Sequence, residues 1–275
     1  MIIVLGLICI SLSGAFSTKA QEIEIADSLV DVGQVDLAVV YYEKAIFSTK
    51  KPETYNTRLF QLAGLYKKRA LFTDYASTLD RINKSVLAVG QKRDLFYELT
   101  LAYYMSQDYA KAYFNWLQYE RIKPELNEDA LLLKTLLFAK LEKWEESQQA
   151  YIAYSNDSSE HSSEIFAEIK SMKKKSPAKA ENLSYYLPGV GQMYAGKPLR
   201  GITSLTLQSG MLAFAAFNFL SGYYISGTFT GVSLFYVFYM GGARHAGYLA
   251  EEYNKSQKEK AFEKLKMLIS ETKKG

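Results

Sequence analysis

Cysteine and histidine are nearly absent from the chain, which has one cysteine and two histidines in 275 residues. The lone Cys9 allows no disulfide within one chain and no cysteine-based metal site. The two histidines are His161 and His245, and the long apolar segments near the C-terminus contain no carboxylate. Catalysis and metal binding therefore lack a set of residues to carry them, and we expect no enzymatic activity, no bound metal and no cofactor.

A nucleotide-binding fingerprint is also missing. Gly189 and Gly191 form a Gly-x-Gly pair of the kind that can cradle a phosphate. The fingerprint requires a strand before the glycines and a soluble helix after them, and this sequence provides neither. We therefore do not expect a nucleotide site there.

Acidic residues are scarce in the second half of the chain. Residues 161–275 contain 15 Lys and Arg against 8 Asp and Glu, a net charge of +7. Residues 21–160 contain 17 against 21, a net charge of −4, and Lys19 completes the total of +4. The lysines of the basic half flank apolar segments, which indicates a soluble domain followed by a membrane-facing one. A nucleic-acid partner is not expected from this arrangement.

The N-terminus lacks the Lys or Arg that usually precedes the apolar core of a secretory signal. Residues 1–16 are otherwise apolar and are followed by small and polar residues. The run is short for a membrane span, so we interpret residues 1–20 as a signal peptide cleaved near Ala20 or Ala15. An uncleaved anchor helix is the alternative.

Two long apolar runs lie near the C-terminus, over residues 202–220 and 228–249. A bilayer core is about 30 Å thick and a helix rises about 1.5 Å per residue, so a spanning helix needs about 20 mostly apolar residues. The first run meets that length, and the second meets it if the helix continues through Arg244 and His245. A short turn, SGYYISG, separates them. We therefore predict a membrane domain over 182–250 that contains an antiparallel transmembrane hairpin.

Small and aromatic residues recur between residues 21 and 155 with a period of 34 to 37. Small residues allow two helices to approach closely, and aromatic residues fill the gap to the next pair. Turn-forming residues separate the sets. The four sets are Ala26, Leu29, Gly33, Ala38, Tyr42 and Ala45; Ala63, Tyr66, Ala70, Phe72, Tyr75 and Leu79; Thr100, Tyr103, Tyr109, Ala112, Trp116 and Tyr119; and Thr135, Phe138, Trp144, Ser147, Tyr151 and Tyr154.

This pattern resembles the tetratricopeptide repeat. The first and third sets match best, whereas the second and fourth are degenerate and lack the turn glycine. The resemblance implies four helix pairs stacked in a curved array. We therefore expect an all-α fold, a tetratricopeptide-like helical solenoid over 21–155 followed by the two-helix transmembrane hairpin.

Tyrosine is abundant, with 22 in the chain, and five in the repeats are candidates for a groove that binds a protein or peptide partner. Tyrosine offers a large contact area with a polar tip, which suits such a groove. Interhelix packing is the competing interpretation for most tyrosines, because they occupy structural positions of the repeat. The five candidates are Tyr41, Tyr66, Tyr97, Tyr103 and Tyr104.

Two polar segments flank the predicted membrane domain. Residues 156–181 read as a linker that ends in a lysine cluster, which would either attract anionic lipid headgroups or simply be solvated. Residues 251–275 form a basic tail whose apolar positions fall on one helical face, so it is either an amphipathic interfacial helix or an ordinary solvated one. Those apolar positions are Phe262, Leu265, Leu268 and Ile269.

The entrance to the predicted membrane domain carries a distinctive P-G-x-G-Q-x-Y motif, and its exit carries a pair of glycines followed by an arginine. These features resemble a family of small bacterial two-helix membrane domains that have no assigned activity. The resemblance implies membrane association. Read from the residues alone, the proline and glycines predict a turn or re-entrant segment at the membrane interface. The residues concerned are Pro188, Gly189, Gly191, Gln192, Tyr194, Gly196 and Gly201 at the entrance, and Gly241, Gly242 and Arg244 at the exit.

The topology signals conflict. Positive charge flanks both outer ends of the hairpin, which favours cytoplasmic repeats, whereas a cleaved signal peptide favours exported ones. We favour the exported arrangement, in which a bacterial inner membrane holds the protein and the repeats are periplasmic. The sequence then predicts a membrane-anchored adaptor that contacts lipid and binds a protein partner. The alternative is a membrane component that oligomerises through the hairpin for transport or envelope assembly and is regulated by its repeats.

Overall fold

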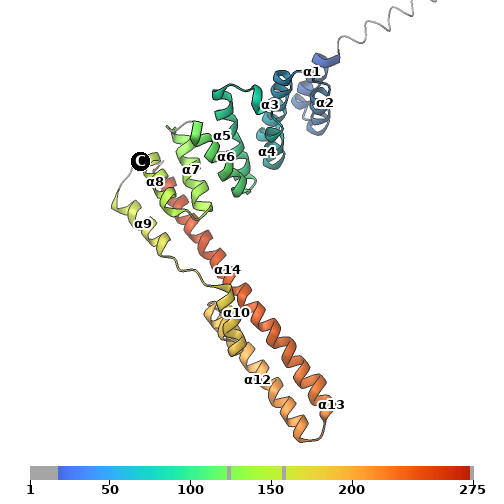
Figure 1. Cartoon of the computed structure of the whole chain (residues 1–275), viewed down its shortest axis with the longest axis vertical. Helices are drawn as coiled ribbons and strands as arrows, with labels where there is room; N and C mark the ends of the chain where they lie inside the picture. Colours follow the sequence, from blue (N-terminus) through green and yellow to red (C-terminus); the bar gives the residue numbers. More distant parts are fainter. Residues whose placement is uncertain (1–17, 123–124, 157–158, 273–275) are drawn as a thin grey trace, which may run out of the picture. The chain divides into compact units, whose positions relative to one another are not determined.

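The computed structural model describes residues 18–122, 125–156 and 159–272, and these residues form helices and no strands. The chain divides into two compact units, Met1–Tyr154 and Ser155–Gly275 (Figure 1). The predicted all-α class is confirmed. Most of the predicted signal peptide, residues 1–17, lies outside the described part, and residues 18–20 begin the first helix.

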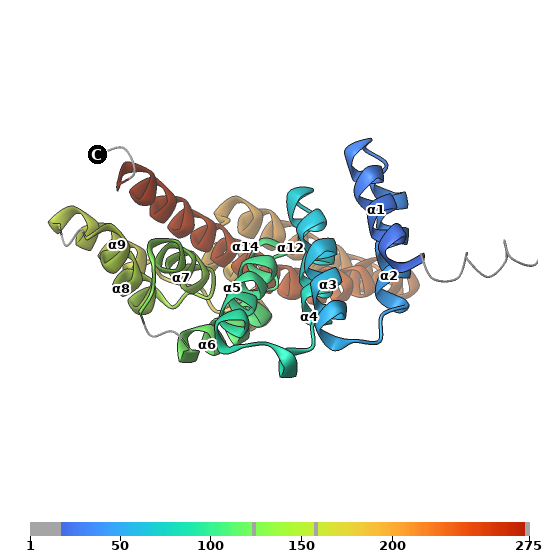
Figure 2. The ribbon, with the colours of Figure 1, turned by 90° about the horizontal axis from the view of Figure 1, so that it is seen from above.

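Unit 1 consists of four successive pairs of helices and one short 3₁₀ helix. Helices of a pair pack against each other, and the pairs follow one another in a row (Figure 2). Where α7 meets α8, the Ser147 hydroxyl donates a hydrogen bond of 2.9 Å to the Thr135 carbonyl. The elements are α1 (Thr18–Asp31), α2 (Val35–Phe47), α3 (Pro52–Lys68), α4 (Phe72–Asp80), η1 (Lys84–Val86), α5 (Val89–Met105), α6 (Tyr109–Ile122), α7 (Glu128–Lys140) and α8 (Trp144–Ser155).

Each pair turns through one residue in the left-handed conformation. These residues are separated by 37, 37 and 35 positions, which matches the period of the sequence pattern. At every turn the left-handed residue and the residue after it donate to carbonyls three and five positions back, the Schellman arrangement that ends a helix. The second and fourth turns lack glycine as expected, and the third lacks it too, so three of the four turns place a residue with a side chain in this conformation. The four residues are Gly33, Ala70, Gln107 and Glu142.

The buried residues of unit 1 fall in columns that follow the same period. Seven positions before each left-handed residue the side chain is small and buried, and nine positions after it a large apolar side chain is buried. Tyr75 is the exception in the column five positions after the turn, where the other three residues are small. The repeat-like helical fold is therefore confirmed. The first two columns are Ala26, Ala63, Thr100 and Thr135, and Tyr42, Leu79, Trp116 and Tyr151.

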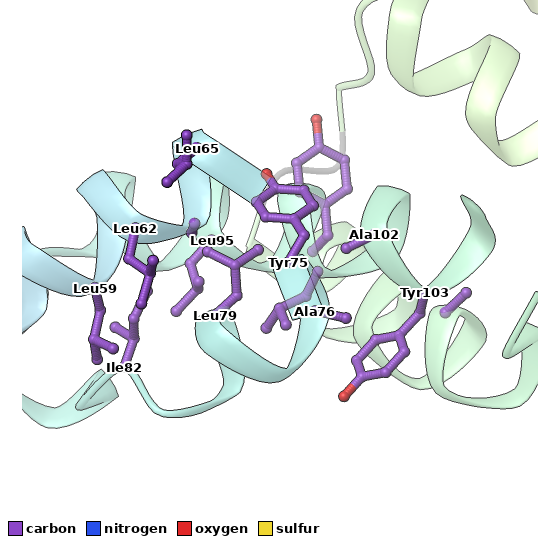
Figure 3. Packing of buried hydrophobic residues seen from close by; sticks show 14 of the residues in the cluster. Leu59, Leu62, Leu65, Tyr75, Ala76, Leu79, Ile82, Leu95, Ala102 and Tyr103 are labelled. Carbon is purple, nitrogen blue, oxygen red and sulfur yellow. The ribbon is translucent and has the colours of Figure 1, made fainter. Parts of the chain in front are cut away.

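The core between α3, α4 and α5 shows how neighbouring pairs share their apolar faces. Leu59, Leu62, Leu79 and Leu95 are each no more than 1% exposed and lie in one cluster (Figure 3). Each pair thus buries its residues against the next pair, as expected of a stacked array.

Unit 2 is a long helical hairpin with shorter helices at its base. Helix α12 and the long α14 lie side by side, and the turn between them lies at the end remote from α10 (Figure 1). Residues 227–232 at the start of the second arm form a π-helix, a wider turn that often marks a functional or strained segment. The elements are α9 (Glu160–Ser171), α10 (Pro177–Tyr186), α11 (Val190–Tyr194), α12 (Pro198–Leu220), α13 (Tyr224–Ser226), η2 (Gly227–Val232) and α14 (Ser233–Thr272).

Within the described ranges, no helix combines the length and the apolar character needed to cross a membrane. The structure therefore does not support the two predicted spans at 202–220 and 228–249. Helix α12 has 23 residues, so it is long enough to cross a bilayer and falls short in its apolar character. Its inward-facing polar residues, such as Ser204, Gln208 and Asn218, lower its mean hydropathy, and α14 carries Arg244 and His245 within the second predicted span.

The segments predicted as a linker and a tail pack together. Residues 160–171 form α9, which contacts the C-terminal part of α14, and Glu168 and Lys264 form an ion pair between the two helices. The apolar face of the tail is buried, with Leu265 at 0% exposure, so in this fold it does not lie free to contact a membrane surface. The sequence could not show this, because the partner helix lies about 100 residues away in the chain.

Candidate functional site

The P-G-x-G-Q-x-Y motif forms a tight junction at the base of the hairpin. Gly189, which precedes α11, has a φ of 91° that only glycine adopts readily. A Cβ at Gly189 would lie 2.1 Å from the Gly201 carbonyl oxygen, and a Cβ at Gly201 would lie 2.5 Å from the Gly189 carbonyl oxygen. These two positions therefore bring the start of α12 against the loop that follows α10, with no room for a side chain on either.

Gly191 brings three helices together. A Cβ at this position would lie 1.9 Å from the Ala180 carbonyl oxygen of α10 and 2.8 Å from the Ala246 Cβ of α14. Ala180 and Ala246 are fully buried, as are Leu249 and Ala250 beside them. Helix α11 is thus wedged between α10 and α14 at backbone contact distance.

The polar residues of the motif hold the same junction with hydrogen bonds. The Gln192 side chain is 2% exposed, and its amide donates to the Gly242 carbonyl at 2.9 Å and accepts from the Ser184 hydroxyl at 3.2 Å. The Tyr194 hydroxyl accepts from the Ser176 backbone amide at 3.1 Å. In this fold the glycines, the glutamine and the tyrosine of the motif therefore meet steric or hydrogen-bonding requirements of the junction.

Of the three predicted exit residues, Gly242 belongs to the junction, whereas Gly241 and Arg244 do not. The Gly242 carbonyl receives the Gln192 hydrogen bond, and a Cβ at Gly242 would lie 3.3 Å from the Gln208 amide nitrogen. A Cβ at Gly241 would meet nothing within 4 Å. Arg244 is exposed, so the structure brings Gln192 and Gly242 together but leaves Arg244 outside the junction.

A pocket of about 590 Å³ opens between α12 and α14, next to this junction. Its walls combine apolar side chains with polar ones, among them Arg200 and His245. Gln208 is 3% exposed, and its amide nitrogen donates to the Ser204 hydroxyl at 2.9 Å, but its Oε1 has no hydrogen-bond partner. The sequence analysis did not single out this pocket, because it forms only when residues about 40 positions apart meet across the hairpin.

Further along the hairpin the two arms touch through small residues. A Cβ at Gly231 would lie 2.5 Å from the Ala215 Cβ. The side-chain amide of Asn218 donates a hydrogen bond of 2.9 Å to the Phe214 carbonyl in its own helix. Large apolar side chains face outward instead: Leu212, Phe214, Phe217, Phe229 and Val237 are each between 44% and 72% exposed. The hairpin is therefore polar and small inside, and apolar outside.

Comparison with protein-family models finds no match, and comparisons with curated proteins and with solved structures find no match either. The two resemblances noted in the sequence therefore stay predictions. What the site can do has to be inferred from its own chemistry.

The five candidate tyrosines of unit 1 differ in burial. Tyr41, Tyr66, Tyr97 and Tyr104 are half-buried and pack against the core, whereas Tyr103 is buried within it. Burial, with a smaller contribution from neighbouring charges, raises the pKa of Tyr97 to about 12. Burial also raises the pKa of Tyr104 to about 12.

Two of these tyrosines line separate pockets. Tyr97 lines a small polar pocket of about 220 Å³. Tyr103 donates a hydrogen bond to Asp80 and lines a pocket of about 460 Å³ between α4, α5 and α6. Phe114, 62% exposed, and Lys111 line the second pocket. Phe114 escaped the sequence analysis, although its place between the core positions Ala112 and Trp116 could have indicated an outward side chain.

Among the described residues, no group of three His, Cys, Asp or Glu side chains is arranged to hold a metal ion. Carboxylates of unit 1 take part in contacts between helices. Glu98 accepts from Lys67 at 2.7 Å and from the Tyr75 hydroxyl at 2.5 Å, which ties α3, α4 and α5 together.

Proposed function

We propose that the protein is an adaptor that the hairpin of unit 2 attaches to a bacterial membrane and that binds a protein partner through its helical repeats. The observation that carries the attachment is the reversed distribution of side chains in the hairpin. In water, large apolar side chains belong inside and contiguous apolar patches on the surface are costly. In lipid, helices associate through small and polar residues and present large apolar ones outward.

The charges beside the hairpin support the same proposal. Lys173, Lys174, Lys179, Lys197 and Arg200 lie at the base of the hairpin, and no acidic residue lies in its two arms between residues 198 and 243. Anionic headgroups attract basic residues by about 1 kcal/mol for each charge near the surface. An apolar arm with a basic base therefore suits a hairpin that enters the membrane with its turn first.

The attachment can be tested by flotation of the full chain with vesicles of phosphatidylethanolamine and phosphatidylglycerol. Replacing both Phe217 and Phe229 by Glu places two charges on the outer face, each costing about 3 kcal/mol in a bilayer interior. We expect this variant to float at least tenfold less than the unmodified chain. Phe47→Glu is the control, because Phe47 is 95% exposed but lies in unit 1. Equal flotation of the three proteins would refute the attachment through the hairpin.

Partner binding by unit 1 rests on the pocket beside Tyr103. It joins exposed aromatic surface with Lys84 and Lys111, the latter also paired with Asp108 at 3.5 Å, and with Asp80, which suits an extended segment that carries an apolar and a polar side chain. A photo-crosslinking amino acid at position 114 should capture the partner in intact cells. The same amino acid at position 47, which is more exposed but lines no described pocket, should not. Equal capture at both positions would mean that the exposure of the position alone explains the crosslinked protein, and that the pocket does not bind it.

The side of the membrane that the repeats face follows from the predicted signal peptide. We propose that unit 1 is exported, and protease treatment of spheroplasts tests this. Digestion of unit 1 from outside, together with a mature N-terminus near Gln21, is the expected result. Protection of unit 1 with Met1 retained would place the repeats in the cytoplasm.

A further inference from the structure

The pocket between α12 and α14 has a composition that matches one class of ligand. Leu199, Leu207, Val237 and Phe238 provide apolar walls, Arg200 provides a positive charge and His245 a polar side chain. The lining contains no Asp or Glu, and within the described residues neither Arg200 nor His245 forms an ion pair. Apolar walls with a cation at one end are complementary to an anionic amphiphile.

The backbone adds to this complementarity. Leu199 and Arg200 belong to the first turn of α12, a helix of 23 residues whose N-terminus carries a partial positive charge. An anionic headgroup at this end would meet the helix terminus and the Arg200 guanidinium together. The pocket volume of about 590 Å³ lies in the range of sites that hold a small ligand, roughly 300–1,000 Å³.

Gln208 provides a second and independent observation. Its side chain lines the pocket, is 97% buried, and leaves its amide oxygen without a hydrogen-bond donor. A buried acceptor without a donor destabilises a fold, so native structures rarely retain one without a reason. A donor group on a bound molecule would satisfy this acceptor after a small rotation of the amide.

Gly241 leaves room at the wall of the pocket. A glycine inside a helix costs about 1 kcal/mol relative to alanine. Gly242 packs against Gln208, but Gly241 is exposed and nothing lies within 4 Å of a Cβ there. Gly241 lines the pocket, so a large side chain at this position would enter it.

From these observations we infer that the pocket between α12 and α14 binds one anionic lipid, with its acid group at Arg200, His245 and the start of α12. The inference rests on the proposed membrane attachment and adds to it a preference for anionic lipids. The shared chemistry is an acyl chain with an anionic head, which either a phospholipid or a free fatty acid can supply.

The test uses the full chain in a neutral maltoside detergent and native mass spectrometry. Phosphatidylglycerol, phosphatidylcholine with the same acyl chains, and oleate are added separately. We expect one phosphatidylglycerol per chain to be retained at least tenfold better than phosphatidylcholine. Retention of oleate instead would keep the site and assign it to a fatty acid.

Two glycine substitutions make a matched pair. Gly241→Leu fills the pocket and should lower phosphatidylglycerol retention at least tenfold. Gly210→Leu also enters open space on a hairpin helix but does not line the pocket, so its retention should be unchanged. Arg200→Gln should reduce the preference for phosphatidylglycerol over phosphatidylcholine.

Three results would overturn the inference: equal retention of the two phospholipids, equal retention by the two glycine variants, or loss of a dimer rather than of lipid in Gly241→Leu. The last result would identify the pocket as a contact between two copies. Flotation separates this inference from the proposed function. A Gly241→Leu chain that floats normally but retains no lipid supports both, whereas an unmodified chain that fails to float refutes the attachment itself.

Discussion

Unit 1 and the two arms of the hairpin in unit 2 are built from the same secondary structure but distribute their side chains in opposite ways. Unit 1 buries large residues such as Leu99 and Trp116, each at 0% exposure. The hairpin arms pack through Gly231 and Ala215 and turn Phe217 outward at 67% exposure. Since helices form in either case, the difference teaches that helix formation by itself does not decide which side chains are buried.

The largest loss of stability is expected from a substitution at the junction at the base of the hairpin. Adding one methyl group in Gly191→Ala places a Cβ at 1.9 Å from a backbone oxygen, which no side-chain rotation relieves. We expect unit 2 to lose about 3 kcal/mol or more. Thermal proteolysis of the full chain in detergent should show residues 160–272 becoming sensitive at a lower temperature. Gly210→Ala, with open space around it, should leave that temperature unchanged or raise it.

Truncating a large side chain should lower the stability of unit 1 but leave the stability of the hairpin in unit 2 nearly unchanged. Leu99→Ala removes a fully buried side chain from unit 1 and should cost about 2–5 kcal/mol. Phe217→Ala removes an outward one from the hairpin and should change the stability of unit 2 by less than about 0.5 kcal/mol.

Both tryptophans, Trp116 and Trp144, lie in unit 1, so their fluorescence during urea unfolding of the full chain reports on that unit alone. Thermal proteolysis measures unit 2. A cost for Phe217→Ala as large as that for Leu99→Ala would mean that the hairpin has an ordinary core, and the reversed distribution would lose its meaning.

The sequence predicted the repeats well because their signal is local and periodic. Ala26 and Ala63 mark equivalent positions without any knowledge of the fold. It could not predict that Ala70 and Glu142 would take the left-handed turn, since the backbone bonds that enforce it depend on the helix already having formed.

At the junction the motif itself was recognisable, but not its purpose. The groups that crowd Gly191 belong to α10 and α14, and the latter is 55 residues away in sequence at Ala246. The sequence placed the motif at a membrane interface, which stays a prediction, and it did not show the contacts within the chain that these residues make. Mean hydropathy likewise does not show the arrangement of α12, because polar residues facing the other arm and apolar residues facing outward are averaged together.

Alkaline pH should affect unit 1 through its buried tyrosines. The pKa of Tyr104 is raised from 10.0 to about 12 by burial, so the folded state holds its proton more tightly than the unfolded state. Stability from this group is present below pH 10 and is lost as the pH rises from 10 to 12. The loss should be roughly 2 kcal/mol, and Tyr104→Phe should remove that part of the pH dependence.

Tryptophan fluorescence during urea unfolding at pH 9, 10 and 11 measures this dependence. Tyr223→Phe serves as the control, because Tyr223 is 65% exposed and lies in unit 2. An unchanged slope of stability against pH in Tyr104→Phe would show that the Tyr104 hydroxyl stays equally solvated in the folded and unfolded chain.

The smallest expected effect concerns the feature that the two units share, the left-handed residue that ends a helix, found at Gly33 and Gln107 in unit 1 and at Gly222 in unit 2. The left-handed conformation costs a residue with a side chain about 1–2 kcal/mol. Glycine avoids this cost but loses more backbone entropy on folding, so the net gain from glycine is smaller. Gln107→Gly should therefore stabilise unit 1 by about 0.5–1 kcal/mol, and Gly33→Ala should destabilise it by about 1 kcal/mol, both measured by tryptophan fluorescence. Gly64→Ala, in the middle of α3 with open space around it, should instead stabilise the unit. If Gly33→Ala and Gly64→Ala changed stability in the same direction, the turn would not depend on the left-handed conformation, and the regular spacing of 37, 37 and 35 residues would need another cause.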